Sequence, residues 1–302
     1  MYEIENASVY NGILIGDKNT HIYNSENGTT HEGGYGISII ACKNVKINNI
    51  EIYDMTGDGI NVYAINKGEK ICQNIEISDN NIWGCRRQGI TIGCGEGIII
   101  KNNEIHDING TAPQSAIDLE GNYQTEIINN VVIENNKIYN LGDINALMLI
   151  GYIENVKIKS NEIEENILIY DAKDTLEMKN NIIKNSNIRF SNDYTNINAG
   201  HNIKNVIFQY NKLEDSSLYL SKVEQADIEK NEIKNGKIEN VSSNSKIHEN
   251  IMTNNKENIE VAIDLSNIIG HTEKYVVQIF NNKIEGNYNQ YLRIDEEFYT
   301  VK

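Results

Sequence analysis

The chain has 302 residues, of which 39% are hydrophobic, and it carries a formal net charge of −16. This charge argues against nucleic-acid binding, because no basic stripe is present to neutralise phosphates, and it favours a neutral or zwitterionic partner over a polyanion. No apolar run reaches about 18 residues, and the N-terminus has no basic segment followed by an apolar one, so we expect no transmembrane helix, no membrane partner and no signal peptide.

A pattern of apolar, any, any, Asn, any, apolar recurs along the chain. Its spacing runs from 19 residues (Asn231 to Asn250) to 33 residues (Asn103 to Asn136), which is the range of solenoid repeats. One earlier repeat has Ile50 in the Asn position. We expect the amides to form an internal ladder that satisfies the backbone of the turns. The column consists of Asn80, Asn103, Asn136, Asn161, Asn181, Asn211, Asn231, Asn250 and Asn282.

Short segments with apolar residues at every second position lie between the Asn sites. A spacing of two favours β-strands over helical repeats, and the irregular period disfavours a leucine-rich horseshoe. A further strand precedes each Asn turn, so every coil has three short strands. The pattern predicts an all-β fold, a single-stranded right-handed parallel β-helix (solenoid) of about 12 coils. The segments between the Asn sites are 12–15, 36–39, 59–62, 89–92, 116–119, 146–149, 166–169, 187–190, 217–220, 236–239, 262–265 and 291–294.

The whole chain, residues 1–302, is expected to form one β-helix domain. A solenoid needs caps on its open edges, yet a coil is already under way at residues 9–15, so we expect an N-terminal cap or domain to be missing or supplied by another chain. Loops between residues 20 and 122 are longer than the later ones and carry most of the rare residue types. Because solenoids place insertions on one functional face, we expect functional coils in 30–122 and structural coils in 123–302.

Residues 112–120 contain the only proline and a strand-like run in which Asp118 and Glu120 alternate with Ile117 and Leu119. Side chains alternate along a strand, so the two carboxylates share one face. Alignment of the coils stacks this pair with other polar side chains within roughly 10 Å along the axis. We predict catalytic roles for Asp118, Glu120, Asp58, Arg86 and Arg87, and substrate-binding roles for His31, Glu32, Asp54, Asn61, Tyr63, Trp83 and Gln88. Acids, guanidinium groups and an aromatic ring on one face suit a carbohydrate polymer.

Most of these residues also have a structural interpretation. The alternatives are turn formation by Asp54 and Asp58, ion pairing by Arg86 and Arg87, loop capping by His31 and Glu32, and packing by Trp83. Asp118 and Glu120 are harder to explain in this way, since adjacent outward acids repel one another unless something binds there. Cys42, Cys72 and Cys94 align on successive coils, which favours a reduced ladder over a disulfide or a zinc site.

Four motifs resemble sequences of the pectate-lyase-like superfamily: THEGGYGI at 30–37, GDGI at 57–60, RRQGI at 86–90 and NGTAPQSAIDLEGN at 109–122. More narrowly, the chain resembles the right-handed β-helix repeat proteins of Gram-positive bacteria and phage tails, of the tailspike or polysaccharide-degrading type. That superfamily includes lyases, glycoside hydrolases, epimerases and trimeric tailspikes, and the fold does not choose among them. The NTD, DD, GHG and RIK motifs of polygalacturonases and the DPHD motif of mannuronan epimerases are missing.

We expect the chain to cleave a polysaccharide, as an endo-glycosidase or a lyase, in a groove on one β-sheet face. As a hydrolase it would need no cofactor and would use paired carboxylates as acid and base or nucleophile, and the acidic charge favours this choice. As a lyase it would bind Ca²⁺ through Asp58, Asp118 and Glu120, and Arg86 or Arg87 would remove the proton.

The alternative function is a non-catalytic glycan-binding module of a tail fibre or tailspike. The resemblance implies a homotrimer, and it places the protein outside the cell or on a phage virion.

Overall fold

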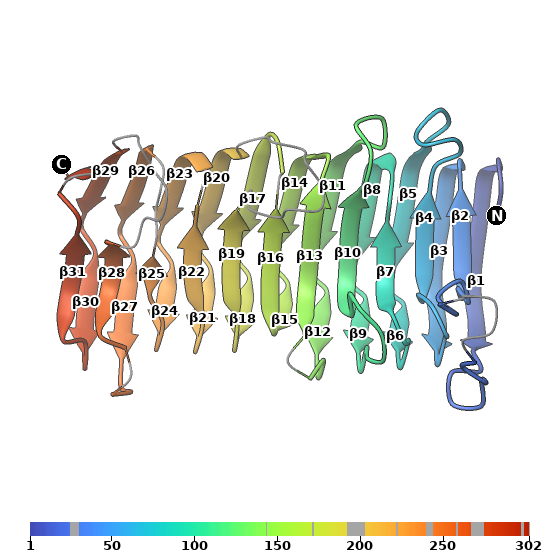
Figure 1. Cartoon of the computed structure of the whole chain (residues 1–302), viewed down its shortest axis with the longest axis horizontal. Helices are drawn as coiled ribbons and strands as arrows, with labels where there is room; N and C mark the ends of the chain where they lie inside the picture. Colours follow the sequence, from blue (N-terminus) through green and yellow to red (C-terminus); the bar gives the residue numbers. More distant parts are fainter. Residues whose placement is uncertain are drawn as a thin grey trace.

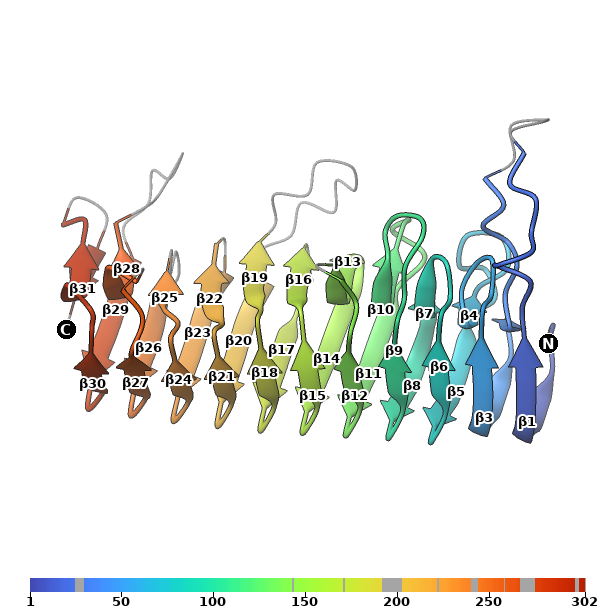
Figure 2. The ribbon, with the colours of Figure 1, turned by 90° about the horizontal axis from the view of Figure 1, so that it is seen from below.

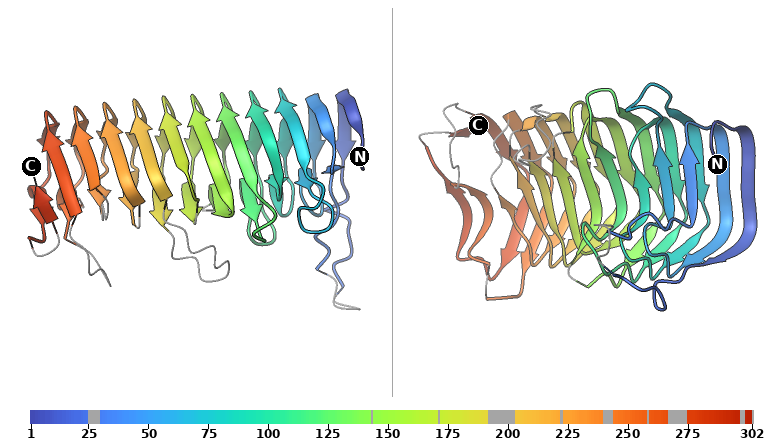
Figure 3. Two further views of the ribbon diagram at one scale, coloured as in Figure 1. Left: turned by 90° about the horizontal axis from the view of Figure 1, so that it is seen from above. Right: turned by 45° about the vertical axis from the view of Figure 1, so that its right-hand side comes forward.

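The computed structural model describes residues 1–24, 30–142, 144–170, 172–191, 203–221, 223–239, 244–257, 259–266, 275–296 and 299–301. Coils of β-strand stack along one axis into a rod, with the N-terminal coil at one end and the C-terminal coil at the other (Figure 1, Figure 3). All regular secondary structure in these residues is β-strand, which confirms the predicted all-β class. Among them, no helix is long and apolar enough to cross a bilayer.

One sheet takes a single strand from each coil and runs the length of the rod (Figure 1). It contains 11 strands in the described residues, each paired in parallel with the strand of the next coil. The strands are β2 (Ile37–Ile40), β4 (Ile60–Tyr63), β7 (Gln88–Ile92), β10 (Ser115–Gly121), β13 (Asn145–Gly151), β16 (Asn166–Tyr170), β19 (Asn187–Ser191), β22 (Ser217–Leu220), β25 (Ile238–Glu239), β28 (Val261–Leu265) and β31 (Gln290–Ile294).

The second sheet contains 21 strands in the described residues, and most coils contribute two strands to it. Its strands are β1 (Glu5–Ile15), β3 (Lys43–Tyr53), β5 (Cys72–Ser78), β6 (Asn81–Trp83), β8 (Gly95–Lys101), β9 (Glu104–His106), β11 (Ile128–Glu134), β12 (Lys137–Tyr139), β14 (Ile153–Lys159), β15 (Glu162–Glu164), β17 (Thr175–Lys179), β18 (Ile182–Lys184), β20 (Ile203–Gln209), β21 (Lys212–Glu214), β23 (Val223–Glu229), β24 (Glu232–Lys234), β26 (Asn244–His248), β27 (Ile251–Asn254), β29 (Tyr275–Phe280), β30 (Lys283–Gly286) and β32 (Tyr299–Val301). A typical coil therefore has the predicted three strands, as in β8, β9 and β10.

Each corner between the two strands of the second sheet is made by a residue with left-handed backbone followed by a residue of the Asn column. Asn102 has a φ of 55° and precedes Asn103, and Asn135 has a φ of 55° and precedes Asn136. Asn tolerates this conformation because its short polar side chain relieves the cost locally. The sequence therefore turns the chain at the position where the ladder residue enters the interior.

The Asn column forms the predicted internal ladder. The backbone N–H and the side-chain Nδ2 of Asn103 both donate to Oδ1 of Asn136, at 2.9 and 3.0 Å, and Nδ2 also donates to the carbonyl oxygen of Ile77 at 3.0 Å. The same three bonds recur at every ladder residue from Asn80 to Asn250. Each amide thus satisfies a buried backbone N–H and a buried carbonyl of the preceding coil, and it bonds to the ladder amide of the next coil.

Apolar side chains fill the interior of the coils. Ile37, Ile60, Ile90 and Ile117 pair in register on successive strands of the 11-stranded sheet and are buried, as their alternation predicts. One predicted segment of this column is wrong: residues 12–15 belong to β1, which pairs with β3 in the second sheet. An apolar alternation looks the same in either sheet, so the sequence did not separate them.

The four cysteines are buried free thiols, which confirms the reduced ladder. The backbone N–H of Cys42 donates to Sγ of Cys72 at 3.4 Å, so neighbouring coils are in contact there. Burial raises the pKa of Cys72 to about 11. Burial also raises the pKa of Cys85 and that of Cys94 to about 12, and all four buried cysteines act as small apolar side chains of the core.

Candidate active site

A row of polar side chains crosses the outer face of the 11-stranded sheet. Backbone register pairs Ser38 with Asn61, Asn61 with Thr91, and Thr91 with Asp118. Glu120 lies two residues after Asp118 on β10 and therefore faces the same side. The stacking predicted from the aligned repeats is confirmed.

Most of this row is buried, as are Asp58 and Gln88 beside it, although the alternation pattern treats the row as outward surface. Asp58 is 0% exposed and Asp118 is 1% exposed, and Gln88 and Thr91 are also buried. A buried polar group is costly unless it is hydrogen-bonded, and a buried charge needs a partner. The contacts within the row therefore decide which groups are satisfied and which remain available.

Asp58 lies just before β4 and is held by Arg87 and by two residues of the row, Thr91 and Asn61. Nη1 of Arg87 lies 3.2 Å from Oδ1 and 3.1 Å from Oδ2 of Asp58. Oγ1 of Thr91 lies 2.8 Å from Oδ2, and Nδ2 of Asn61 donates to the same oxygen at 3.3 Å. Burial raises the pKa of Asp58, while Arg87 and these hydrogen bonds oppose that shift. The carboxyl group is fully used in holding Arg87 in place.

Asp118 has one satisfied oxygen and one unsatisfied oxygen. Nε2 of Gln88 donates to Oδ2 of Asp118, and Oε1 of Gln88 lies 2.6 Å from Oγ1 of Thr91. Oδ1 of Asp118 is buried and has no hydrogen-bond partner in the described part of the chain. Burial, followed by the charges of Glu120 and Asp58, raises the pKa of Asp118 well above its ordinary value, although Arg87 opposes them. A carboxyl group in this environment favours its protonated form.

Glu120 is half-buried beside the same positive charge. Burial raises the pKa of Glu120, and Arg87 opposes the shift. Burial would lower the pKa of Arg87, but Asp58, Tyr63 and Asp118 raise it more, so the guanidinium stays charged. Burial and then Glu120 raise the pKa of the Tyr63 hydroxyl above its ordinary value.

The absence of a side chain at Gly93 leaves space for the Tyr63 ring. A Cβ added at Gly93 would lie 2.5 Å from Cε1 of Tyr63, closer than real Cβ contacts. The ring of Tyr63 therefore packs over the backbone of the next coil because that position lacks a side chain.

Replacement of Asp118 by asparagine is expected to stabilise the protein increasingly as the pH rises. The folded-state pKa of Asp118 is raised from 3.8, so folding takes up a proton, and the free energy of unfolding falls as pH rises through the interval above about pH 4. Asparagine removes this loss. Urea unfolding should show a larger stability gain for Asp118→Asn at about pH 8 than at about pH 4.

Asp215 provides a control of opposite sign. Its pKa is lowered, chiefly by the contact with Lys256, whose Nζ lies 2.6 Å from Oδ1. Its stabilising contribution is present above the unfolded-state pKa and is lost as pH falls. Asp215→Asn should therefore become relatively less stable as pH rises, and equal pH dependence of the two variants would contradict the assignment for Asp118.

Asp58, Asp118, Glu120 and Arg87 form one polar cluster on the outer face of the sheet. Three further residues belong to it but were not predicted as site residues: Tyr35, Thr91 and Ser115. Burial and then Asp58 raise the pKa of Tyr35. Oγ of Ser115 is buried without a hydrogen-bond partner among the described residues. A signal was available, because aligning the repeats places Tyr35, Ser115 and Gln88 in one column directly before the strands.

Arg86 is used to hold loops. Its Nη1 donates to the carbonyl oxygens of Thr30 and His31, each at 3.2 Å, and its guanidinium lies 4.4 Å from the centre of the Tyr23 ring. Nδ1 of His31 lies 3.0 Å from Nε2 of His21. These contacts tie the connection between β1 and β2, which extends beyond the coils in Figure 2, to the loop before β7. They assign Arg86 a structural role in place of the predicted catalytic one.

Trp83 lies in an aromatic stack on the second sheet. Its ring stacks on Tyr53 at 4.4 Å on one neighbouring coil and on His106 at 5.8 Å on the other, and His106 stacks on Tyr139 at 5.0 Å. Both faces of the indole are therefore covered by neighbouring rings, which leaves neither face for a sugar. The packing alternative replaces the predicted sugar-binding role of Trp83.

Asp54 and Glu32 differ in their relation to the cluster. Asp54 has a φ of 56° and lies in the turn after β3, with its backbone N–H donating to the carbonyl of Trp83. That is the turn role considered for it from the sequence. Oε2 of Glu32 lies 3.8 Å from Nε of Arg87, so Glu32 remains close to the buried acids.

The carboxylates of Asp58, Asp118 and Glu120 do not fit a calcium site. Their oxygens do not form a group in which three possible ligand atoms lie within 4.8 Å of one another. Among the described residues, such a group lies elsewhere, at Asp227, Glu229 and His248. Both oxygens of Asp58 already contact the Arg87 guanidinium, whose charge repels a cation. The cluster is better suited to proton transfer than to binding Ca²⁺.

Comparison with known proteins gives two relatives in Bacillus subtilis (strain 168). The uncharacterized protein YclG is 31% identical over 194 residues, which cover 60% of this chain and 32% of that protein. The SPbeta prophage-derived uncharacterized protein YorA is 33% identical over 128 residues, covering 39% of this chain and 22% of that protein. The chain thus spans about a third or less of the length of these relatives.

Solved structures with a similar course include the mannuronan C-5 epimerase AlgE4 A-module of Azotobacter vinelandii, with 14% identity, a TM-score of 0.43, and coverage of 86% of this chain and 65% of that one. Another is the tailspike gp49 of Acinetobacter baumannii bacteriophage Fri1, a capsular polysaccharide depolymerase, with 12% identity, a TM-score of 0.40, and coverage of 93% and 44%. The family model of the right-handed beta helix region matches residues 2–137 and 69–197. The chain therefore belongs to the right-handed β-helix family.

Proposed function

We propose that the chain hydrolyses a polysaccharide on the outer face of the 11-stranded sheet, with Asp118 as the proton donor. The observation that carries the proposal is a buried carboxyl group with a raised pKa and an oxygen, Oδ1, that lacks a hydrogen-bond partner among the described residues. A protonated carboxyl whose second oxygen is held by Gln88 donates through the free one. Because Asp118 is 1% exposed, the glycosidic oxygen reaches it only when neighbouring side chains move on binding.

Glu120 is the partner carboxylate in this proposal. Burial raises the pKa of Glu120, and the charge of Arg87 opposes this shift. The pKa of Asp118 is raised by burial and, in addition, by the negative charges of Glu120 and Asp58. Two neighbouring carboxyls whose environments separate their pKa values take the acid and the base roles. Glu120, the more accessible of the two, activates water or attacks the anomeric carbon.

Hydrolysis is favoured over elimination by the state of the arginines. A lyase of the predicted type needs a neutral arginine as base, but Arg87 is paired with Asp58 and its pKa is raised. The guanidinium of Arg86 is bonded to backbone carbonyls of the loop before β2. Arg87 instead supplies a fixed positive charge that steadies the ionised form of Glu120.

The substrate class follows from charge and from the aromatic groups. A net charge of −16 and three acids in the cluster favour a neutral or zwitterionic polymer. Tyr63 and Tyr35 flank the acids and provide apolar surface for a sugar ring. One relative is prophage-derived, which is consistent with a protein that meets a cell-surface polymer from outside the cell or on a phage particle. The homotrimer remains part of the proposal on the tailspike resemblance alone.

The proposal is tested with a panel of neutral, zwitterionic and acidic glycans from bacterial cell walls and capsules. New reducing ends without an unsaturated sugar indicate hydrolysis, and an ultraviolet-absorbing unsaturated end indicates elimination. If the wild-type protein binds a glycan but never shortens it, the chain is a glycan-binding module of the tail-fibre type and the hydrolase proposal fails.

A further inference from the structure

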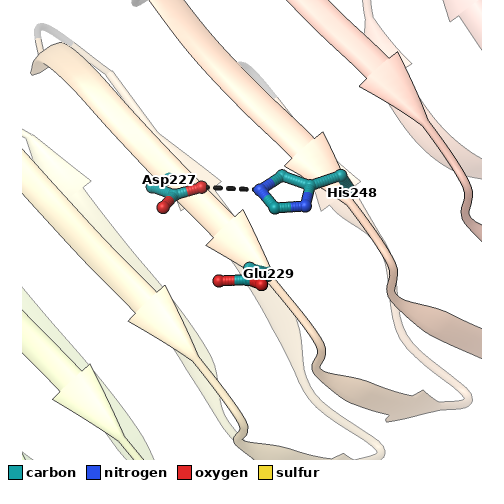
Figure 4. Close-up of side chains that lie close together, drawn as sticks. All are labelled: Asp227, Glu229 and His248. Atoms are coloured by element: carbon teal, nitrogen blue, oxygen red, sulfur yellow. Dashed lines mark hydrogen bonds and ion pairs between the residues drawn. The ribbon is translucent and has the colours of Figure 1, made fainter.

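A second cluster of charged side chains lies on neighbouring coils far along the rod from Asp118. Asp227 and Glu229 are two residues apart on β23 and face the same side, and backbone register pairs Glu229 with His248 on β26. One oxygen of each carboxylate and one ring nitrogen of His248 lie within 4.8 Å of one another. Figure 4 shows the three side chains converging from the two strands.

The orientation of His248 is set by its surroundings. Its ring stacks on Phe280 of the next coil, with centroids 4.7 Å apart and planes 9° apart. The residue is 9% exposed, and its Nε2 lies 2.9 Å from Oδ1 of Asp227 (Figure 4). The imidazole is thus held with one nitrogen directed at the carboxylates, which is how a preorganised ligand is presented.

The other ring nitrogen suggests what replaces the proton on Nε2. Nδ1 of His248 is buried without a hydrogen-bond partner among the described residues, and it lies 3.5 Å from Oε1 of Glu249. In a neutral ring that carries its proton on Nε2, the lone pair of Nδ1 would face the negatively charged carboxylate of Glu249, which is an unfavourable contact. A metal ion on Nε2 would leave the proton on Nδ1, facing Glu249, which is the usual carboxylate–histidine–metal arrangement. An imidazolium also satisfies both nitrogens, and a titration with the metal alone separates the two.

Two neighbours bear on the charge of the cluster. Nε2 of Gln209 lies 2.9 Å from Oδ2 of Asp227 and 3.0 Å from Oε2 of Glu229, so the amide bridges the two carboxylates. Rotation of that amide by half a turn presents its oxygen as a further neutral ligand. Nζ of Lys230 lies 2.5 Å from Oε1 of Glu229 and is a cation that competes for this carboxylate.

We propose that Asp227, Glu229 and His248 bind a divalent transition-metal ion of the Zn²⁺ type. One imidazole nitrogen and two carboxylate oxygens are donors that suit such ions, and the two negative charges balance the ion. The ligands come from two coils and Gln209 from a third, so the bound ion cross-links β20, β23 and β26. Its role is to fix the stacking of this half of the rod, independently of the proposed hydrolase.

The experiment is a calorimetric titration with ZnCl₂, after chelator treatment and dialysis, in a His21→Ala background. That background is needed because His21 and His31 bring two ring nitrogens to 3.0 Å and would bind the same probe. We expect one saturable Zn²⁺ per chain and a rise in the thermal unfolding midpoint with added Zn²⁺. The isosteric variants Asp227→Asn and Glu229→Gln should each weaken binding at least tenfold, and Lys230→Met should strengthen it.

His106→Ala is the matched control, because Nδ1 of His106 also contacts an aspartate, Asp107, at 2.6 Å, and the residues that the structure describes place no second carboxylate ligand there. It should leave Zn²⁺ binding unchanged. Circular dichroism in chelator checks that each variant is folded. The proposal is overturned if the background protein binds no Zn²⁺, which identifies a simple imidazolium ion pair, or if Asp227→Asn and Glu229→Gln bind Zn²⁺ as tightly as the background protein.

Discussion

Asp118→Asn is expected to lower kcat for glycan hydrolysis by about 10³-fold, with little change in the affinity for the glycan. The amide keeps the shape of the carboxyl group and the contact with Gln88, but it has no acidic proton to give to the leaving oxygen. The same acid role predicts that kcat falls as pH rises through the raised pKa of Asp118, because the donor is then ionised. Initial rates of reducing-end formation and glycan binding, measured over a pH series, check both points.

Glu120→Gln should have an effect of similar size, and the double variant should lose little more than either single one, because the two carboxyls act in one reaction. Asp264→Asn is the matched control. Asp264 occupies the same outward row of the 11-stranded sheet as Asp118, because successive register pairs connect the two residues. Its carboxylate contacts Arg293 at 3.2 Å. Equal losses of activity in the control and in Asp118→Asn would remove Asp118 from the catalytic role.

Asn161→Ala is expected to destabilise the protein by about 3 kcal/mol. The substitution removes Oδ1, which accepts from the backbone N–H and from Nδ2 of Asn136 at 2.9 and 3.0 Å, and it removes Nδ2, which donates to the carbonyl of Ile133 at 2.9 Å. All of these groups are buried within the coils, so water does not replace the lost bonds. Urea unfolding followed by circular dichroism measures the change.

Asn155→Gly is the control for this prediction. Nδ2 of Asn155 donates to Oδ1 of Asn129 at 3.0 Å, which is an Asn–Asn contact between coils like those of the ladder, but this contact is exposed. The φ of Asn155 is 53°, which glycine adopts without strain. The expected loss is below about 0.5 kcal/mol. If both variants lose the same stability, burial is not what makes the internal ladder important.

Much of the architecture could be predicted because the repeat couples local and tertiary structure. In a solenoid, each residue contacts its counterpart one coil away, so aligning the repeats is equivalent to listing contacts. The aligned repeats therefore predicted the pairing of Asn61 with Thr91 and of Thr91 with Asp118. The misplaced segment 12–15 marks the limit, since both sheets use the same alternation.

The candidate site was predicted less completely. Alternation indicated that Asp118 faces outward from the coil, but outward did not mean exposed, because neighbouring side chains bury it. The repeat pattern also does not predict the direction in which a long side chain points. Arg86 and Arg87 are adjacent in sequence, yet one binds loop carbonyls and the other binds Asp58.

The cluster of Asp227, Glu229 and His248 shows the same limit in the later coils, which carried no unusual motif. Its residues are common types at ordinary spacing, and their convergence depends on which strands lie side by side and on the rotamers they adopt.

The sequence by itself determined the β-helix, its internal Asn ladder and the stacking of the acids, because these follow from a period that repeats along the chain. Only the tertiary structure decided which acids are buried, which are paired and which oxygen is left unsatisfied. Those properties depend on side-chain directions and on desolvation by several coils at once, and no spacing of residues encodes them.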